Sequence, residues 1–505
     1  MLVPTRRIDI DYRSAGFWED RTLSSYLDEA GTRHPDVTAI AAGTHRTRYR
    51  EMRGAAASLA HALSRRWVRP RDVVTVFLPN WPESALAIHA ITWSGCVVSP
   101  VVTTYRRAEL SFILTQSGSR AIFIPHVFRD FNFVTLLSEV IADMDDPPAV
   151  IVVRPQGDLP EGFFALDDLL DQHGTMDPAG DPADICLLLY TSGTTSAPKG
   201  VLHSHQTIIW EMRSIIRELQ LSSDDSTFMA SPIGHLTGIV YGVYLPTVLA
   251  NTAALLDVWD APAAADIIDQ HACRVSLGAT PFLQGLTTEY ERRGTCSSLH
   301  TFICGGADVP ADLVARGSRV LGARVTRTYG LSEMPTFSIS GADAAPEQCA
   351  HTDGTPIEPA DGYLLNESDG VGELVVRGPE LFLGYLDAAL NEDAFTDDGY
   401  FRTGDLVSID PAGALSVRGR MKDIIIRGGE NISALEVEEV LLTMPGVVEA
   451  VVVAAPDDRL GERTAAVLRV RDGHPMPTID DVRDHFKQAG IARQKWPEEL
   501  HQVDD

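Results

Sequence analysis

Hydrophobic and polar positions along the first 180 residues alternate between two periods. Apolar residues three and four positions apart, as in Tyr49–Arg65, predict amphipathic helices, whereas short apolar runs that end in a breaker, as in Asp72–Pro79, predict buried strands. The helical segments are Leu23–Ala30, Tyr49–Arg65 and Ser84–Gly95, and the strand segments are Ala39–Ala42, Asp72–Pro79, Cys96–Val102, Ala121–Pro125 and Val150–Val153. Strands that alternate with helices predict parallel sheets covered on both faces.

The alternation continues after residue 200 and changes character near Val371. Helices are predicted at Thr207–Leu219 and Ala261–His271, and strands at Ile185–Tyr190, Ala253–Leu256 and Thr301–Cys304. Val275–Pro281 is predicted to be a strand that ends in a turn. The short β segments Gly372–Gly378, Leu406–Asp410 and Ala414–Arg418 then predict a small distorted barrel. A last α/β unit follows, with strands at Asp423–Arg427 and Val447–Ala454 and a helix at Ala434–Leu442.

We therefore predict an α/β protein of two domains. Residues 1–420 form a large N-terminal domain of two α/β subdomains and the small distorted β-barrel, and residues 421–505 form a small, mobile α+β C-terminal domain. A chain of 505 residues with 44% hydrophobic residues is long enough to build more than one core.

Charge and targeting signals narrow the class of protein. The 70 acidic and 42 basic residues give a net charge of −28, which argues against a general binder of nucleic acids or anionic membranes. Charged residues in Met1–Ser14 leave no apolar core for a signal peptide, and polar residues interrupt Val73–Val102, so no membrane span is predicted. The six cysteines include no CxxC pair. We predict a cytoplasmic protein, whose oligomeric state the sequence leaves open.

A loop rich in glycine and hydroxyl residues follows the apolar strand Ile185–Tyr190. The loop, Thr191–Gly200, offers backbone N–H groups that can approach a ligand closely, five hydroxyl side chains and the cation of Lys199. These are the groups that grip the phosphates of ATP. It is not a Walker loop, because Pro198 precedes the lysine and glycine follows it. A flexible linker is the alternative, but linkers rarely follow a buried strand directly.

Tyr190–Gly200 resembles the phosphate-binding signature of the adenylate-forming superfamily, which contains acyl- and aryl-CoA synthetases, peptide-synthetase adenylation domains and luciferases. Three later segments resemble further motifs of that family, in its order: Thr328–Glu333 its adenine and magnesium motif, Tyr400–Asp405 its ribose motif, and Gly419–Asn431 its hinge and thioester motif. Ser231–Gly238, Gly278–Phe282 and Arg427–Ser433 look most like short- and medium-chain acyl-CoA synthetases and cyclohexanecarboxylate-CoA ligases.

The resemblance implies an AMP-forming acid–thiol ligase. Such an enzyme uses ATP and Mg²⁺ to convert a carboxylic acid, here a short- or medium-chain fatty acid or an alicyclic acid, into an acyl-adenylate, and then transfers the acyl group to coenzyme A. The catalytic residues that it implies are Lys199, Glu333, Arg420 and Lys422, of which Glu333 would also ligate Mg²⁺, a cation that prefers oxygen ligands.

The resemblance also implies three binding sites. The ATP site would contain Thr191, Ser192, Gly193, Thr194, Thr195, Lys199, Gly305, Gly306, Ala307, Thr328, Tyr329, Gly330, Ser332, Asp405 and Arg420. The acyl pocket would contain His235, Ala279, Thr280, Pro281 and Tyr329, and Gly428 and Gly429 would let coenzyme A pass close to the backbone. A structural role for His235 and a plain surface position for Lys422 remain the alternatives.

Two other functions stay open. The family pattern continues into a Pro-Arg-Thr…Gly-Lys motif whose lysine contacts the reacting carboxylate and the α-phosphate, whereas this sequence ends at Asp505 before that motif. The C-terminal domain therefore looks truncated, and no residue is assigned that lysine's role. One alternative is a catalytically impaired protein that binds a nucleotide or adenylate, and the other is an acyl-AMP ligase that loads a carrier protein.

Overall fold

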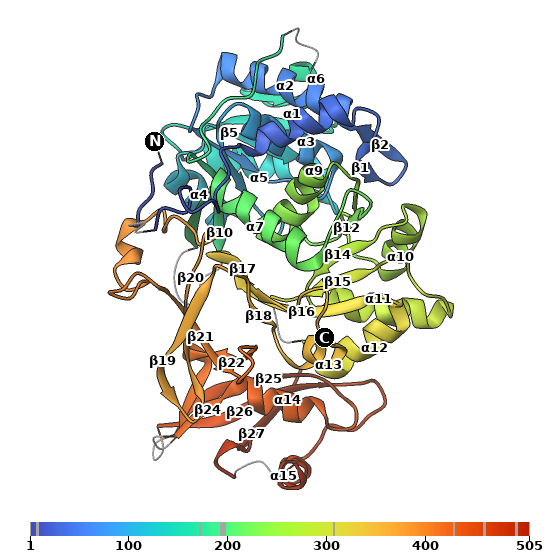
Figure 1. Cartoon of the computed structure of the whole chain (residues 1–505), viewed down its shortest axis with the longest axis vertical. Coiled ribbons are helices and arrows are strands. Elements are labelled where there is room, and N and C mark those ends of the chain that lie inside the picture. Colours follow the sequence, from blue (N-terminus) through green and yellow to red (C-terminus); the bar gives the residue numbers. More distant parts are fainter. Residues whose placement is uncertain are drawn as a thin grey trace. The chain divides into compact units, whose positions relative to one another are not determined.

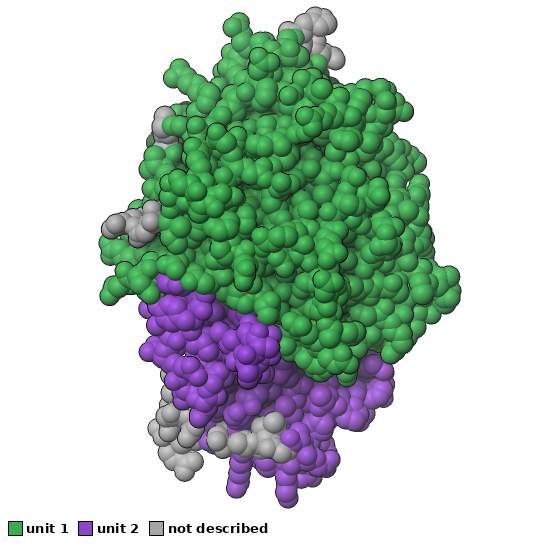
Figure 2. Space-filling model, viewed as in Figure 1, with its two compact units in different colours: residues 1–361, 377–399 green, residues 362–376, 400–505 purple. Residues whose placement is uncertain are grey.

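The computed structural model describes residues 2–6, 10–170, 174–191, 198–306, 309–427, 430–457, 461–489 and 493–503. The chain divides into two compact units, one of residues 1–361 and 377–399 and the other of residues 362–376 and 400–505 (Figure 2). The second unit thus includes residues 400–420, which precede the predicted boundary. The boundary at residue 420 and the hinge at Lys422 stay predictions.

A seven-stranded sheet forms the first part of unit 1. Its strand order is β11-β10-β4-β3-β5-β8-β9, and every pair is parallel except β10 with β11. Helices α4 (Arg107–Ser117) and α5 (Phe133–Ile141) share its hydrophobic core through Leu110, Ile113 and Leu137. The strands are β3 (Val73–Val76), β4 (Val97–Pro100), β5 (Ala121–Pro125), β8 (Ala149–Val153), β9 (Phe163–Ala165), β10 (Ile185–Thr191) and β11 (Lys199–Ser204).

A nine-stranded sheet forms the rest of the unit, in the order β18-β17-β16-β15-β14-β12-β13-β1-β2. The strands from β16 to β1 are parallel, and the outer pairs are antiparallel. Helices α10 (Ala261–Gln270), α11 (Thr280–Arg293) and α12 (Ala311–Leu321) lie beside it (Figure 1). The strands are β1 (Thr38–Ala42), β2 (His45–Arg48), β12 (Thr227–Met229), β13 (Ala253–Leu255), β14 (Val275–Gly278), β15 (Thr301–Cys304), β16 (Arg324–Leu331), β17 (Met334–Ile339) and β18 (Thr355–Pro356).

Helix α3 (Pro82–Trp93) packs between the two sheets. It contacts β1 of the larger sheet and β3 and β4 of the smaller one, and nearly all its side chains are buried. A helix buried on every side needs no polar stripe, which agrees with its mainly apolar sequence. The remaining elements of the unit are α1 (Leu23–Arg33), α2 (Tyr49–Arg66), α6 (Leu166–Leu170), α7 (His205–Leu219), α8 (Leu236–Ile239), η1 (Val240–Tyr244), α9 (Leu245–Leu249), α13 (Pro346–His351), η2 (Ala388–Asn391), β6 (Val127–Phe128) and β7 (Phe131–Asn132).

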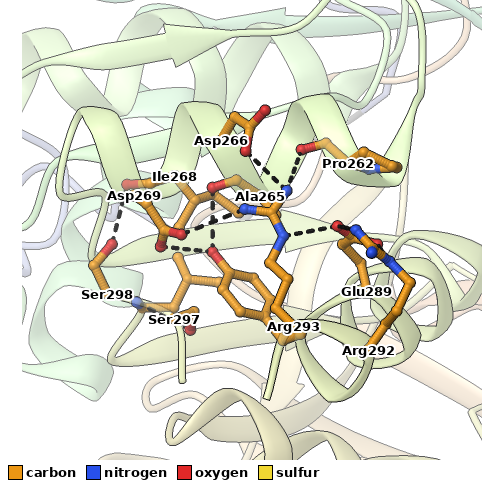
Figure 3. Close-up of polar contacts among 12 residues, drawn as sticks. Pro262, Ala265, Asp266, Ile268, Asp269, Glu289, Arg292, Arg293, Ser297 and Ser298 are labelled. Atoms are coloured by element: carbon orange, nitrogen blue, oxygen red, sulfur yellow. Dashed lines mark hydrogen bonds and ion pairs between the residues drawn. The ribbon is translucent and has the colours of Figure 1, made fainter. Parts of the chain in front are cut away.

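Charged side chains tie α11 to α10 (Figure 3). The guanidinium of Arg293 contacts Asp266 at 2.8 Å and Glu289 at 2.7 Å, and the Tyr290 hydroxyl donates to Asp269 at 2.8 Å. Glu289 also accepts from Arg292, and these hydrogen bonds lower its pKa to about 2. The network fixes the C-terminal half of α11 against α10.

Unit 2 contains two sheets. The first has the order β19-β20-β21-β22, from strands β19 (Asp361–Ser368), β20 (Val371–Arg377), β21 (Phe401–Ile409) and β22 (Leu415–Arg420). The second has the order β24-β23-β26-β25, with β27 also paired to β26, and α14 and α15 share its core. Its elements are η3 (Met421–Asp423), β23 (Ile424–Arg427), β24 (Glu430–Ser433), α14 (Ala434–Leu442), β25 (Val447–Asp457), β26 (Gly461–Val470), α15 (Ile479–Gln488), η4 (Arg493–Lys495) and β27 (Glu499–Gln502).

The structure confirms the predicted α/β class and the order of its elements. Several strand boundaries differ from the prediction: β3 ends at Val76, three residues before Pro79, and β21 begins at Phe401, five residues before Leu406. The turn predicted at the end of Val275–Pro281 is the first turn of α11, where the missing N–H of Pro281 costs nothing. The antiparallel strand β11 was also not predicted, since its residues follow the phosphate loop without a break in pattern. None of the described helices combines the length and apolarity needed to cross a bilayer.

Candidate active site

Four neighbouring parallel strands of the larger sheet end at one edge, and predicted site residues follow or end each of them. The strand order is β12, β14, β15, β16, and the register pairs Gly278 with Cys304 and Cys304 with Arg327. Ligands of parallel sheets bind beyond the carboxyl ends of the strands. In strand order the predicted residues are His235, then Ala279, Thr280 and Pro281, then Gly305 and Gly306, and then Thr328, Tyr329 and Gly330.

The backbone at Gly305 passes very close to the neighbouring strand. A Cβ atom on this residue would lie 2.6 Å from the Thr328 methyl carbon and 2.8 Å from the Thr328 carbonyl oxygen. Only glycine fits there, so the two strand ends approach more closely than side chains would permit. Tyr329 is buried beside them, whereas Gly306 is exposed. The place of Gly305, Gly306 and Tyr329 in the ATP site stays a prediction.

Glu333 lies in the turn between β16 and β17 and is buried. Its Oε1 accepts a hydrogen bond of 2.6 Å from the hydroxyl of Tyr385, and its carbonyl accepts one of 2.8 Å from the N–H of Phe382. The Nζ of Lys199 lies 5.1 Å from the centre of the Tyr385 ring. Burial and the adjacent Glu333 raise the pKa of Tyr385 above its ordinary value, so the phenol remains a donor at neutral pH.

Lys199 begins β11 and faces Thr191, the last residue of β10, across an antiparallel pair. The predicted phosphate loop therefore connects two strands of one hairpin. The loop residues Ser192, Gly193, Thr194 and Thr195 lie outside the described residues, as do Ala307, Gly428 and Gly429.

A buried histidine connects this hairpin with the Glu333 turn. The ring of His203, on β11, makes a 2.8 Å hydrogen bond to the carbonyl of Ser332 and a 3.1 Å hydrogen bond to the Thr207 hydroxyl. Burial lowers the pKa of His203 to about 4, so the ring is neutral at pH 7. Its two nitrogens must then act as one donor and one acceptor, and the Ser332 carbonyl can only accept. His203 thus holds the backbone of Ser332, one of the residues predicted for the ATP site.

Apart from the buried Tyr329, the predicted acyl residues are half-buried or exposed. His235 precedes α8, and its side chain is exposed, yet the protein around the ring still lowers its pKa. Ala279 and Thr280 are half-buried and Pro281 is exposed. A His235 that is neutral and accessible can line a site for an uncharged acyl chain, but its role as an acyl contact stays a prediction.

Two of the predicted residues meet in unit 2. Asp405 on β21 pairs directly with Arg420 on β22, and the Arg420 Nε lies 3.3 Å from the buried Asp405 carboxylate. The hydroxyl of Thr403 accepts from the Asp405 N–H at 3.1 Å and donates to the Leu374 carbonyl at 2.7 Å. Lys422 lies in η3, and its side chain is outside the described residues. Asp405 is thus held in one orientation by its neighbours.

Glu333, the predicted magnesium ligand, is a single buried carboxylate and not part of a metal cage. Among the side chains that the structure describes, no three His, Cys, Asp or Glu residues gather closely enough to hold a metal ion. Mg²⁺ commonly binds through one or two carboxylates, waters and substrate phosphates. Glu333 therefore fits a Mg²⁺ that is shared with a nucleotide, and not a resident protein-only site.

Sequence reasoning missed Tyr385 and His203. Tyr385 follows the apolar run Leu381–Leu383 and Gly384, a signal that could have predicted one more strand-like segment after β20. Its partner Glu333 lies 52 residues earlier, and no local pattern connects the two. His203 lies within β11, and the sequence does not show which carbonyl oxygen its ring contacts.

Comparison with known proteins agrees with this geometry. The sequence profile of the AMP-binding enzyme family matches residues 27–386, and that of its C-terminal domain matches residues 436–505. A medium-chain fatty-acid–CoA ligase of Escherichia coli is 30% identical over 97% of this chain and 88% of its own length. A salicyl-AMP ligase/salicyl-S-ArCP synthetase of Mycobacterium tuberculosis is 31% identical over 97% and 88%.

Solved structures show the same fold. The o-succinylbenzoate CoA synthetase of Bacillus subtilis, in complex with its acyl-adenylate intermediate, superposes with a TM-score of 0.83 at 24% identity and covers 96% of this chain and 95% of its own. The family profiles, the relatives and the fold agree with the four ordered motifs. The chain therefore belongs to the AMP-binding enzyme family and is an adenylate-forming ligase.

Proposed function

We propose that this protein uses ATP to convert a carboxylic acid into an acyl-adenylate and then transfers the acyl group to coenzyme A. The proposed acid is a short- or medium-chain fatty acid or an alicyclic acid. One observation carries the proposal. The predicted adenine and acyl residues follow or end the neighbouring strands β12, β14, β15 and β16, while Lys199 and Glu333 both contact Tyr385, the first at its ring and the second at its hydroxyl. A relative over nearly the whole chain is named a medium-chain fatty-acid–CoA ligase, which supports the acid class.

In the first half-reaction a carboxylate oxygen of the acid bonds to the α-phosphorus of ATP, and the bond from that phosphorus to pyrophosphate breaks. The chain contributes positioning and charge. Lys199 would supply a cation for the phosphates, and Ser332, whose carbonyl is bound by His203, would contact the α-phosphate. Gly305, whose backbone passes close to Thr328, would lie with Tyr329 beside the adenine.

Mg²⁺, when bound with the nucleotide, neutralises charge on the phosphate oxygens. Glu333 is the residue that would hold it. Because the Glu333 carboxylate is buried and hydrogen-bonded, it can present a fixed negative charge without first losing side-chain freedom.

In the second half-reaction the sulfur of coenzyme A bonds to the acyl carbon, the bond from that carbon to the AMP oxygen breaks, and the thiol proton passes to solvent. Roles for Asp405 and Arg420 at the ribose, Lys422 at the hinge, and Gly428 and Gly429 beside the pantetheine remain parts of this proposal. The buried Asp405 supports the ribose role, since a carboxylate can accept from two hydroxyls at once.

The test uses the full chain with ATP, MgCl₂, coenzyme A and a panel of acids. The panel runs from acetate to dodecanoate and adds cyclohexanecarboxylate, benzoate and salicylate. We expect acid-dependent exchange of pyrophosphate into ATP and release of AMP with an acyl-CoA product, at the highest kcat/KM for an unbranched or alicyclic acid. His235→Ala should raise the KM of the acid about tenfold without changing that of ATP, whereas His34→Ala, at an exposed helix end, should change neither.

Two results would change the proposal. Adenylation without any thioester would favour transfer to a carrier protein, the activity in the name of the salicyl-AMP ligase relative. A chain that gains thermal stability with ATP but shows no pyrophosphate exchange with any acid would favour a nucleotide-binding protein.

A further inference from the structure

Residues 381–386 form an extended segment between β11 and Glu333. The N–H of Leu383 donates to the Leu202 carbonyl at 2.7 Å, the N–H of Leu386 donates to the Gly200 carbonyl at 2.7 Å, and Tyr385 forms a bridge with Val201. The segment therefore runs alongside the strand that starts with Lys199. Its other contact, from the Phe382 N–H to the Glu333 carbonyl, joins the same segment to the turn after β16.

The N-terminal residues of the chain hold this segment from a second side. The N–H of Thr5 donates to the Leu383 carbonyl at 2.9 Å, and its hydroxyl donates to the Tyr385 carbonyl at 2.7 Å. The guanidinium of Arg6 donates to the carbonyls of Phe382 and Leu381, the second at 3.3 Å. Residues 5 and 6 thus donate hydrogen bonds to most of the backbone carbonyls of residues 381–386, which lie nearly 380 positions later in the sequence.

Gly384 makes this contact possible. A Cβ atom there would lie 2.2 Å from the Thr5 hydroxyl oxygen and 2.9 Å from the Arg6 nitrogen, and the φ of +104° disfavours other residues. The backbone on either side of Tyr385 is therefore fixed by β11 and by residues 5 and 6. The position of its ring follows from that backbone.

We propose that Tyr385 is a positioning residue for the adenylation reaction, and that Thr5 and Arg6 hold it in place. Its hydroxyl fixes the carboxylate of Glu333 at 2.6 Å, and its ring lies 5.1 Å from the Nζ of Lys199. One side chain thereby sets the separation between the metal-binding anion and the phosphate-binding cation. The proposal rests on the proposed function, since it gives Glu333 and Lys199 the roles stated there.

Partners that orient a metal-binding carboxylate typically change metal affinity by about 10- to 100-fold when they are removed. The test therefore measures metal binding directly. Mn²⁺ is titrated into the full chain in the presence of the non-hydrolysable analogue α,β-methylene-ATP, and bound Mn²⁺ is measured by electron paramagnetic resonance. We expect Tyr385→Phe, which keeps the ring below Lys199, to weaken Mn²⁺ binding about tenfold and to raise the Mg²⁺ concentration for half-maximal pyrophosphate exchange by a similar factor.

Tyr290→Phe is the matched control. Tyr290 is also buried and also donates to a carboxylate, that of Asp269 on α10. It should lower the melting temperature without changing either metal measurement. Equal Mn²⁺ affinity in Tyr385→Phe and the wild type would overturn the positioning role alone, whereas a wild-type chain that binds no Mn²⁺ with the nucleotide would overturn the proposed function as well.

Arg6→Met tests the support from the N-terminal residues and leaves the phenol in place. We expect it to weaken Mn²⁺ binding in the same direction, by about threefold, because the Glu333 carboxylate keeps its hydrogen bond but loses part of its fixed position. If Tyr385→Phe does not fold, as judged by circular dichroism, the Arg6→Met result decides the proposal, and unchanged Mn²⁺ binding in that variant contradicts it.

Discussion

The two parts of the candidate site in unit 1 are built in different ways. The adenine and acyl residues follow β12, β14, β15 and β16, which are neighbours in one parallel sheet, so ordinary sheet topology brings them together. Lys199, Tyr385 and Glu333 come from a hairpin, an irregular segment and a turn, and individual backbone and side-chain contacts between these distant segments join them. The first part should tolerate single substitutions better than the second, whose geometry depends on a few hydrogen bonds.

The largest effect is expected from Glu333→Gln. Glutamine can still accept from the Tyr385 hydroxyl, so the fold should persist, but the charge is lost. Removing one group that stabilises transition-state charge typically lowers kcat by about 10²–10³. The rate of acid-dependent pyrophosphate exchange measures the change. A variant that kept more than half of the wild-type rate would show that Glu333 does not act in the reaction and would remove the main contrast between the two parts of the site.

A smaller effect is expected from Gly305→Val, which probes the sheet-edge part. The new side chain must push the end of β15 away from Thr328 and so disturb the adenine-binding surface. We expect the KM for ATP to rise about tenfold, or about 1.4 kcal/mol in binding, with little change in the Mg²⁺ requirement. Gly54→Ala, on an exposed face of α2 where a Cβ meets nothing, is the control and should leave the KM unchanged. An unaltered KM in Gly305→Val would mean that the nucleotide does not use this edge.

The smallest effect on activity is expected from Glu289→Gln, in the remote network that holds α11. Hydrogen bonds from Arg292 and Arg293 lower the pKa of Glu289 from 4.5 to about 2. A lowered carboxyl pKa adds stability in full above pH 4.5, and this stability is lost as the pH falls from 4.5 towards 2. Urea unfolding should therefore show a wild-type chain that is more stable than the variant at pH 6, with a gap that narrows at pH 4 and pH 3.

The kinetic constants of Glu289→Gln should stay within about twofold of the wild type, because the network acts on α11 far from its first turn. A stability gap that does not depend on pH would show that packing, and not the ionised carboxylate, joins α10 to α11.

Much of the fold could be predicted because its elements have strong local patterns. The buried run Ile185–Tyr190 became β10, and Ala434–Leu442 became α14 with the predicted bounds. The end of β3 was misplaced by three residues, since the apolar run Asp72–Pro79 gives no sign of where its strand stops. The turn predicted after β14 is the start of a helix with an early proline.

The candidate site divides in the same way. The sequence by itself determined the chemical groups: the lysine after the phosphate loop, the glycines after β15, Glu333, and the pair Asp405 and Arg420. Only the tertiary structure decided that Tyr385 meets Glu333, that His203 meets Ser332, and that Thr5 and Arg6 hold the segment before Leu386. The physical reason is that motifs record which groups a chain carries, whereas hydrogen bonds between distant segments depend on how whole sheets pack, and no local pattern encodes that.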